Sequence, residues 1–348
     1  MLLNRNNPHG GDIYANRAIL DFSANINPLG MPEAVKEALI RAAGHADVYP
    51  DPRCGALRER IAQAEGVPMD GILCGNGAAE LIYLYAYALR ERDTRPVLVI
   101  VPTFCEYELA LDAAGLHTER YFLREDEDFR LTAAVLGLEF ERYAAVFLCS
   151  PNNPTGIAAD PALIRRLAET GVRLFCDFCF LDLTEDPGRY GIPALIREHP
   201  NVTVLRAFTK SYAMAGVRLG YAISSDSEFL GAMAEKCQCW NVSVPAQEAG
   251  IAALGCRDWL HSSVKQITRE RIRLRDGLRA CGLRVLPGEA NYLSFRCDRD
   301  LPALLRERGI LVRDCSAIPG MGKGWVRIAV RTPEENGRLL CAVMEVLS

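Results

Sequence analysis

The chain has 348 residues, of which 49% are hydrophobic and 24% are charged, and its formal net charge is −4. These values exclude a disordered chain and a small disulfide-stabilised scaffold, and they provide enough apolar residues for a large core. The sequence shows no basic block typical of nucleic-acid binding, no apolar run long enough for a membrane span and no signal peptide. We therefore expect a cytoplasmic protein with reduced cysteines that binds neither nucleic acid nor membrane.

Helices and strands are expected to alternate along most of the chain. The N-terminal arm, residues 1–27, has the composition of a loop with one short strand near Ile19–Phe22. Apolar periodicity then predicts helices at 33–43, 55–65, 78–90 and 105–114. Short apolar runs predict strands at 97–101, 119–122, 144–149, 172–177, 202–206 and 218–223. This alternation indicates an α/β protein whose mostly parallel sheet is covered by helices on both faces.

The pattern changes after Pro245. A long charged helix is expected at about 257–281, and it leads into a second, smaller α+β unit. In that unit we expect strands at 283–286, 292–297, 311–313 and 326–330, and helices near 301–308 and after residue 332. Thr332, Pro333 and Glu335 give the last helix an N-cap, a proline in its first turn and a capping-box acid.

Lysine is rare, and one of the five lysines has an unusual place. Lys210 follows the apolar strand 202–206 and precedes a turn of small residues, whereas the other four lie on charged helical faces or in a glycine-rich loop. A buried amine is costly unless it is paired or used covalently, which favours a Schiff-base lysine. A lysine on a surface loop is the alternative.

Polar or aromatic residues follow three other predicted strands. Asp177 ends an apolar strand and needs a cationic partner, either the pyridinium nitrogen of pyridoxal phosphate or one of the 35 arginines. Asn152 and Asn153, in the run PNNPTG, either form a plain turn or include an amide that donates to a cofactor ring oxygen. Phe104 either stacks on a cofactor ring or belongs to the core.

A glycine-rich turn at Gly75–Gly77 precedes a predicted helix, and the free amides of a helix N-terminus suit a phosphate. Glu80 occupies the third glycine position of the dinucleotide fingerprint, so a nicotinamide enzyme is not supported. Arg218, eight residues after Lys210, could bind the same phosphate. Neither the histidines nor the cysteines have metal-ligand spacing, so no metal site is expected.

Taken together, these motifs resemble those of the fold-type I, aspartate-aminotransferase-like enzymes that use pyridoxal 5'-phosphate. The resemblance covers nearly the whole chain and rests on Gly75–Glu80, Phe104, PNNPTG, Asp177, TKSYAMAGVRLGY and VRIAV, in that order. Among the class I/II aminotransferases, the sequence is similar to the histidinol-phosphate aminotransferase branch. Its run from His9 to Pro32 and its final RIAVR are most similar to the threonine-phosphate decarboxylases of that branch.

The resemblance implies three regions and a shared cofactor site. Residues 1–44 would form the arm and first helix, packing with the small domain and the active site, residues 45–244 the large cofactor-binding domain, and residues 245–348 the small C-terminal domain. Lys210 would form the Schiff base, Asp177 would pair with the pyridinium nitrogen, and Asn153 would bond the ring oxygen. The remaining cofactor contacts would come from Phe104, Gly77, Ala78, Thr209 and Arg218, and from Tyr49 of the neighbouring subunit of a homodimer.

The resemblance also implies a small phosphorylated amino acid as substrate. Arg327 would bind its carboxylate, with Asn27 and Arg331 nearby. A second phosphate needs donors of its own, and His9, Gly10 and Gly11 are the candidates, because close backbone amides and a histidine suit an anion. A disordered N-terminus is the alternative.

The implied reaction is decarboxylation of L-threonine O-3-phosphate in cobalamin biosynthesis. The alternatives are transamination of histidinol phosphate or a related amine, decarboxylation of a related substrate such as L-serine O-phosphate, and a non-catalytic protein on this fold. The sequence departs from the family at three positions. Ala207 replaces a Ser or Thr on the cofactor phosphate, Phe178 replaces an acidic residue, and Phe180 replaces the tyrosine of the aminotransferases, as it does in the decarboxylases.

Overall fold

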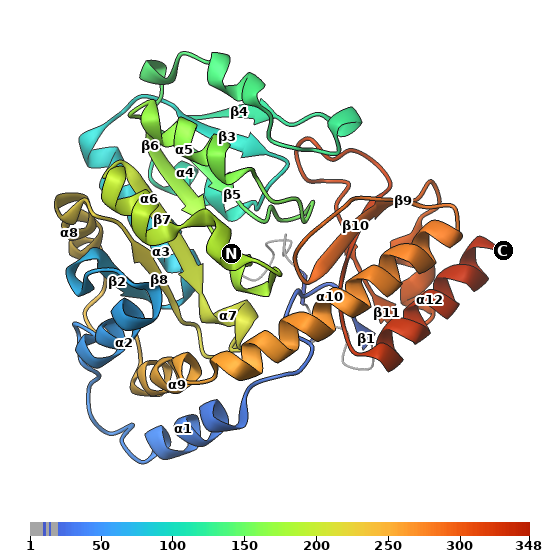
Figure 1. Ribbon diagram of the computed structural model, residues 1–348, viewed down its shortest axis with the longest axis horizontal. Coiled ribbons are helices and arrows are strands. Elements are labelled where there is room, and N and C mark those ends of the chain that lie inside the picture. The colour runs from blue at the N-terminus through green and yellow to red at the C-terminus, as the bar shows by residue number, and fades with distance from the viewer. Residues whose placement is uncertain (1–9, 12–13, 15–19) are drawn as a thin grey trace.

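The computed structural model describes residues 10, 11, 14 and 20–348, and its largest element is a seven-stranded sheet (Figure 1). The strand order is β2-β8-β7-β6-β5-β3-β4, and β8 runs antiparallel to both of its neighbours while the other pairs are parallel. The strands are β2 (Ile72–Gly75), β3 (Val97–Val101), β4 (Thr118–Phe122), β5 (Ala145–Cys149), β6 (Arg173–Asp177), β7 (Val202–Ala207) and β8 (Gly220–Ile223). The mostly parallel α/β sheet expected from the sequence is therefore confirmed.

Two strand predictions need correction. The sequence reading missed β2, because its four residues end in the glycine turn and are too few to show a period. Arg218 was expected to begin a strand, but β8 begins at Gly220. Arg218 instead has a left-handed backbone, with φ of 61°, which interrupts extended structure just before the strand.

Helices cover both faces of this sheet. One face packs against α3 (Gly77–Arg92), α4 (Glu106–Ala113) and α8 (Ser227–Glu235). The other packs against α2 (Gly55–Glu65), α5 (Pro161–Glu169) and α6 (Ile192–Glu198). Because side chains alternate along a strand, Asp177 shares the α3/α4 face with Phe175, whereas Arg206 faces the α2/α6 side with Val204. We call these the α4 face and the α2 face.

The C-terminal part of the chain forms the smaller α+β unit that the sequence predicted. A long helix, α10 (Arg257–Ala280), runs from the large sheet to this unit (Figure 1). Its antiparallel sheet has the order β12-β13-β10-β9. The elements are β9 (Arg284–Val285), β10 (Tyr292–Arg296), α11 (Leu301–Glu307), β12 (Arg313–Asp314), β13 (Trp325–Ala329) and α12 (Pro333–Leu347). The predicted capping box of Thr332 and Glu335 is present at the start of α12.

The N-terminal segment connects the two units. Strand β1 (Leu20–Asp21) pairs in parallel with β11 (Ile310–Leu311), and α1 (Glu33–Ala43) packs on α9 (Val244–Leu254). Between them, the chain passes the short helix α7 (Phe208–Ser211), which follows β7 directly. In the part of the chain that the structure describes, no helix has the length and apolar character of a membrane span.

Candidate active site

The amine of Lys210 lies at the end of β7, on the single turn of α7. Burial, followed by the positive charge of Arg327, lowers the pKa of Lys210 to about 8. The ring of Phe180 lies 5.9 Å from the Nζ atom. The neutral form, which acts as the nucleophile, is therefore far more populated near neutral pH than in an ordinary lysine, although the charged form still predominates.

Asn27 holds the turn that carries Lys210. Its backbone N–H donates to the Lys210 carbonyl at 3.1 Å, and its Nδ2 donates to the Ser211 carbonyl at 2.8 Å. The same Nδ2 donates to Ser263 Oγ of α10 at 2.8 Å. Asn27, expected near the substrate, thus joins the N-terminal segment, α7 and α10 at the base of the site.

Asp177 places a buried carboxylate at the end of β6. Tyr107 Oη donates to its Oδ2 at 2.5 Å, and the Cys179 N–H donates to its Oδ1 at 2.9 Å. Both donors are neutral, and no salt bridge to Asp177 occurs among the described residues. A buried carboxylate without a cation is costly, so this position suits a cationic group that arrives from outside the chain.

The two asparagines of PNNPTG have different surroundings. Asn152 is buried and bonds the Pro102 carbonyl and the hydroxyls of Thr103 and Thr155, so it holds the loop together. Asn153 instead accepts a hydrogen bond through Oδ1 from Arg327 Nη1. This contact brings the loop after β5 to the buried guanidinium on β13, whose Nη2 also donates to the Ser23 carbonyl at 2.7 Å.

The backbone at the N-terminus of α3 lies close to the Arg218 side chain and to Gly220 of β8. A Cβ atom on Gly77 would lie 2.5 Å from Arg218 Nη2, and one on Gly220 would lie 2.7 Å from the Ala78 nitrogen. Thr209 is buried on α7, next to the lysine. Only glycine fits at positions 77 and 220, and the result is an arginine beside the free amides of a helix N-terminus, which suits a phosphate.

Phe104 lies two residues before α4, with its ring edge-to-face on Tyr107 at a centroid distance of 5.7 Å. Tyr107 was not predicted as a site residue, although its place three residues after Phe104 puts both rings on one side of a helical turn. The three-residue spacing of Phe104 and Tyr107 could therefore have identified Tyr107 as a residue near the site. The contact of Tyr107 with Asp177 joins residues 70 positions apart, which no local pattern reports.

The glycines of the N-terminal arm lie against the residue that Arg327 contacts. The Gly11 N–H donates to Ser23 Oγ at 2.7 Å, and a Cβ on Gly10 would lie 2.3 Å from the Ser23 carbonyl oxygen. His9 lies outside the described residues.

Two other predicted residues have partners of their own. Arg331 donates to Glu335 at 2.7 Å, and Glu335 also belongs to the capping box of α12. Tyr49 is 76% exposed and stacks on Trp240, with 4.2 Å between ring centroids. Among the described residues, neither forms a hydrogen bond or a ring contact with Lys210.

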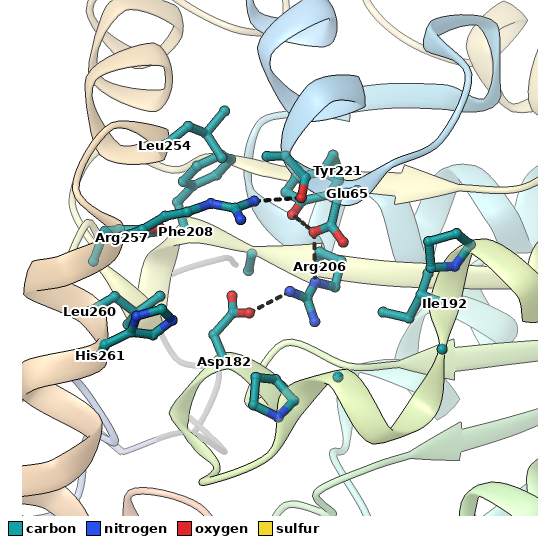
Figure 2. A pocket seen from close by; sticks show the side chains of 17 residues that line it. Glu65, Asp182, Ile192, Arg206, Phe208, Tyr221, Leu254, Arg257, Leu260 and His261 are labelled. Atoms are coloured by element: carbon teal, nitrogen blue, oxygen red, sulfur yellow. Dashed lines mark hydrogen bonds and ion pairs between the residues drawn. The ribbon is translucent and has the colours of Figure 1, made fainter.

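A cavity of about 290 Å³ lies on the α2 face of the sheet, behind α7 (Figure 2). Arg206 is buried there between Glu65 and Asp182 and forms an ion pair with each. Although burial alone would lower it, these two carboxylates hold the pKa of Arg206 well above its usual value. Ser211 Oγ donates to Asp182 at 3.2 Å, so the network also supports the turn that carries Lys210.

The geometry of the α4 face defines a class of enzyme. A largely buried amine with a lowered pKa lies near a buried carboxylate without a cationic partner, and glycine amides and arginines surround them. These groups match the aldehyde, ring nitrogen and phosphate of pyridoxal 5'-phosphate. The fold is that of a fold-type I, pyridoxal-phosphate-dependent enzyme of the aspartate-aminotransferase type.

Comparison with known proteins identifies the family. The chain belongs to the aminotransferase class I and II family, whose model matches residues 17–343. It is 36% identical, over 99% of its length and 97% of the relative's, to a threonine-phosphate decarboxylase from Salmonella typhimurium. It is 33% identical, over 93% of its length and 87% of the relative's, to a histidinol-phosphate aminotransferase from Methanosarcina mazei.

A solved structure agrees with this assignment. The crystal structure of the histidinol-phosphate aminotransferase from Clostridium acetobutylicum superposes with a TM-score of 0.87 and 28% sequence identity. The match covers 94% of this chain and 99% of that one. The chain is therefore a pyridoxal-phosphate enzyme of the group that contains both activities.

Proposed function

We propose that the protein decarboxylates L-threonine O-3-phosphate to (R)-1-aminopropan-2-yl phosphate, a step of cobalamin biosynthesis. The observation that carries the proposal is the position of the N-terminal arm. Gly10 and Gly11 pack on Ser23, which accepts a hydrogen bond from Arg327, so a glycine-rich segment borders the buried arginine. The 36% identity with a threonine-phosphate decarboxylase extends over nearly the whole chain and supports the same reaction.

Each of several residues on the α4 face would bind a different part of the cofactor. Lys210 would bond the cofactor aldehyde, Asp177 would pair with the ring nitrogen, Asn153 would bond the ring oxygen, and Phe104 would stack on the ring. The phosphate would be held by the amides of Gly77 and Ala78, together with Thr209 and Arg218. When bound, the cofactor supplies an electron sink for the pair left when a bond to the substrate α-carbon breaks.

Residues other than those that hold the cofactor phosphate would bind the substrate anions. Arg327 would bind the carboxylate, because it is buried and touches Asn153. His9 and the amides of Gly10 and Gly11 would bind the substrate phosphate. Arg331, paired with Glu335, would add to the positive potential nearby. Phe180, whose ring lies 5.9 Å from the Lys210 amine, offers no hydroxyl where the resemblance places the tyrosine of the aminotransferases.

Enzymes of this fold typically form homodimers, and the exposed Tyr49 is consistent with such an assembly. Its ring, stacked on Trp240, presents an aromatic surface to the outside of the chain. We propose that Tyr49 of the partner subunit completes the cofactor phosphate site. The active unit would then be a dimer with two shared sites.

The holoenzyme incubated with L-threonine O-3-phosphate should release CO2 and the aminopropanol phosphate in equal amounts. Lys210→Ala should lower the rate by roughly three orders of magnitude or more and remove the visible absorption band of the bound cofactor. An active Lys210→Ala variant with an unchanged band would contradict the role of the lysine. A wild-type enzyme that leaves the phosphoamino acid intact would contradict the decarboxylase assignment.

The second candidate is a histidinol-phosphate aminotransferase or a related aminotransferase. It is favoured by the 33% identity with such an enzyme over 93% of the chain, and it would use the same cofactor residues. The same assay separates the two functions. A decarboxylase releases CO2 without an amino acceptor, whereas an aminotransferase given histidinol phosphate consumes 2-oxoglutarate and forms glutamate.

A further inference from the structure

Tyr107 makes a contact that the cofactor roles above do not use. It lies on α4, is fully buried, and donates from Oη to Asp177 Oδ2 at 2.5 Å. The Cys179 N–H occupies the other oxygen at 2.9 Å. The two donors come from different elements, one from the helix that covers the strand and one from the backbone just beyond the strand.

The phenol of Tyr107 remains a donor throughout the working range of an enzyme. Burial and then the negative charge of Asp177 raise the pKa of Tyr107 well above its usual value. Among the described residues, the titratable groups near this carboxylate on other elements include the buried thiols of Cys149 and Cys179, the phenol of Tyr292 and the amine of Lys210. Tyr107 therefore fixes the carboxylate without supplying a positive charge that would neutralise it.

The same helical turn also carries Phe104, whose ring meets Tyr107 edge-to-face. Through Tyr107, the first turn of α4 thus contacts both the Phe104 ring and the Asp177 carboxylate. We propose that Tyr107 is a positioning residue that holds Asp177 in the orientation in which it meets the ring nitrogen of the cofactor. This inference rests on the proposed role of Asp177.

Tyr85 provides a matched control. It is fully buried in the same aromatic cluster, where it packs edge-to-face on Phe147 and Phe175 with centroid distances of 5.4 and 4.8 Å. Tyr107 contacts the same two rings at 5.6 and 6.2 Å. The hydroxyl of Tyr85 has no hydrogen-bond partner among the described residues. Removal of either hydroxyl therefore affects the same aromatic cluster, but only removal of the Tyr107 hydroxyl takes a hydrogen bond from Asp177.

The test compares Tyr107→Phe and Tyr85→Phe holoenzymes by equilibrium dialysis against pyridoxal 5'-phosphate and by visible circular dichroism of the bound cofactor. Loss of a hydrogen bond to a charged group should weaken cofactor affinity by about tenfold in Tyr107→Phe and should change the dichroism band. Tyr85→Phe should stay within about twofold of wild type, with the wild-type band. Melting temperatures of both variants report any change in core packing.

A double-mutant cycle separates positioning from a general effect on the core. In the Asp177→Asn background, Tyr107→Phe should change cofactor affinity by less than about twofold, because its target is no longer a carboxylate. If Tyr107→Phe matches Tyr85→Phe in affinity and dichroism, or keeps its full effect in the Asp177→Asn background, the inference is wrong. A wild-type protein that fails to bind the cofactor would instead contradict the proposed function.

Discussion

Asp177 and Asp182 lie five residues apart in the sequence but belong to networks on opposite faces of the sheet. On the α4 face, Asp177 accepts hydrogen bonds from two neutral donors. On the α2 face, Asp182 and Glu65 flank Arg206 and form ion pairs with it (Figure 2). In the second network each carboxylate forms an ion pair with an arginine of the chain, whereas among the described residues the Asp177 carboxylate has no salt-bridge partner.

The difference shows how a buried carboxylate can be classified from its partners. A carboxylate paired with an arginine of the same chain contributes to stability, and breaking that pair leaves a buried charge uncompensated. A carboxylate held by a phenol and a backbone amide is fixed in place but keeps its full charge. Burial alone does not separate the two cases, and the identity of the hydrogen-bond donors does.

The largest expected effect is on the α4 face. Asp177→Asn keeps the shape of the side chain but removes its charge, so cofactor affinity and turnover should fall by about a hundredfold or more. The Asn Oδ1 can still accept from the Cys179 N–H, and its Nδ2 can donate to Tyr107 Oη, so the free energy of unfolding of the apoenzyme should change by less than about 1 kcal/mol. Cofactor titration and urea unfolding measure the two quantities. If Asp177→Asn causes a large loss of stability but leaves cofactor affinity unchanged, then Asp177 contributes to stability and not to cofactor binding.

The second effect, on the α2 face, should have the opposite character. Asp182→Asn leaves Arg206 with one carboxylate partner, and we expect a loss of about 2 kcal/mol in the free energy of unfolding, less than for a fully buried pair because Asp182 is 24% exposed. Cofactor affinity should change by less than about threefold. Asp186→Asn, at an exposed position on the following segment, is the matched control and should have no measurable effect. If Asp182→Asn weakens the free energy of cofactor binding by more than it lowers the free energy of unfolding, then Asp182 acts on the site through Ser211.

The sequence allowed prediction of those features that depend on local patterns. Apolar runs of strand length fixed the alternation of the large sheet, and they placed Asp177 and Lys210 at strand ends, where α/β sheets bind ligands. Thr332 and Glu335 identified the start of α12 from a four-residue motif. In each case, the signal and the structure that it specifies lie within a few residues of each other.

Contacts between distant segments could not be predicted in this way. Arg206 was expected only as the end of an apolar strand, because its partners Glu65 and Asp182 come from two other elements. The contact of Tyr107 with Asp177 depends on how α4 packs on the sheet, which no periodicity reports. The final RIAVR motif led us to expect Arg331 near the substrate. That motif does not report that the Arg331 side chain also forms a hydrogen bond with Glu335. The side-chain networks therefore had to come from the structure.

The smallest expected effect concerns the pH dependence of stability on the α4 face. The pKa of Lys210 is lowered from 10.5 to about 8, so between these values the unfolded chain binds more protons than the folded apoenzyme. The stability contribution of this residue should therefore rise with pH from about 8 to about 10.5, and below pH 8 the full cost of the buried charge should be present. Lys210→Met removes this cost.

The measurement is urea unfolding of the two apoenzymes across this range. The variant should be more stable relative to wild type at neutral pH than above pH 10.5, by about 1–3 kcal/mol, because the lysine as a whole residue is only partly buried. Any constant gain from the apolar side chain cancels in this difference between pH values. Lys265→Met, on the exposed side of α10, should follow the wild-type curve at every pH. If the Lys210→Met difference is independent of pH, the amine is solvated in the apoenzyme, and the α4 face imposes no electrostatic cost on its lysine before the cofactor binds.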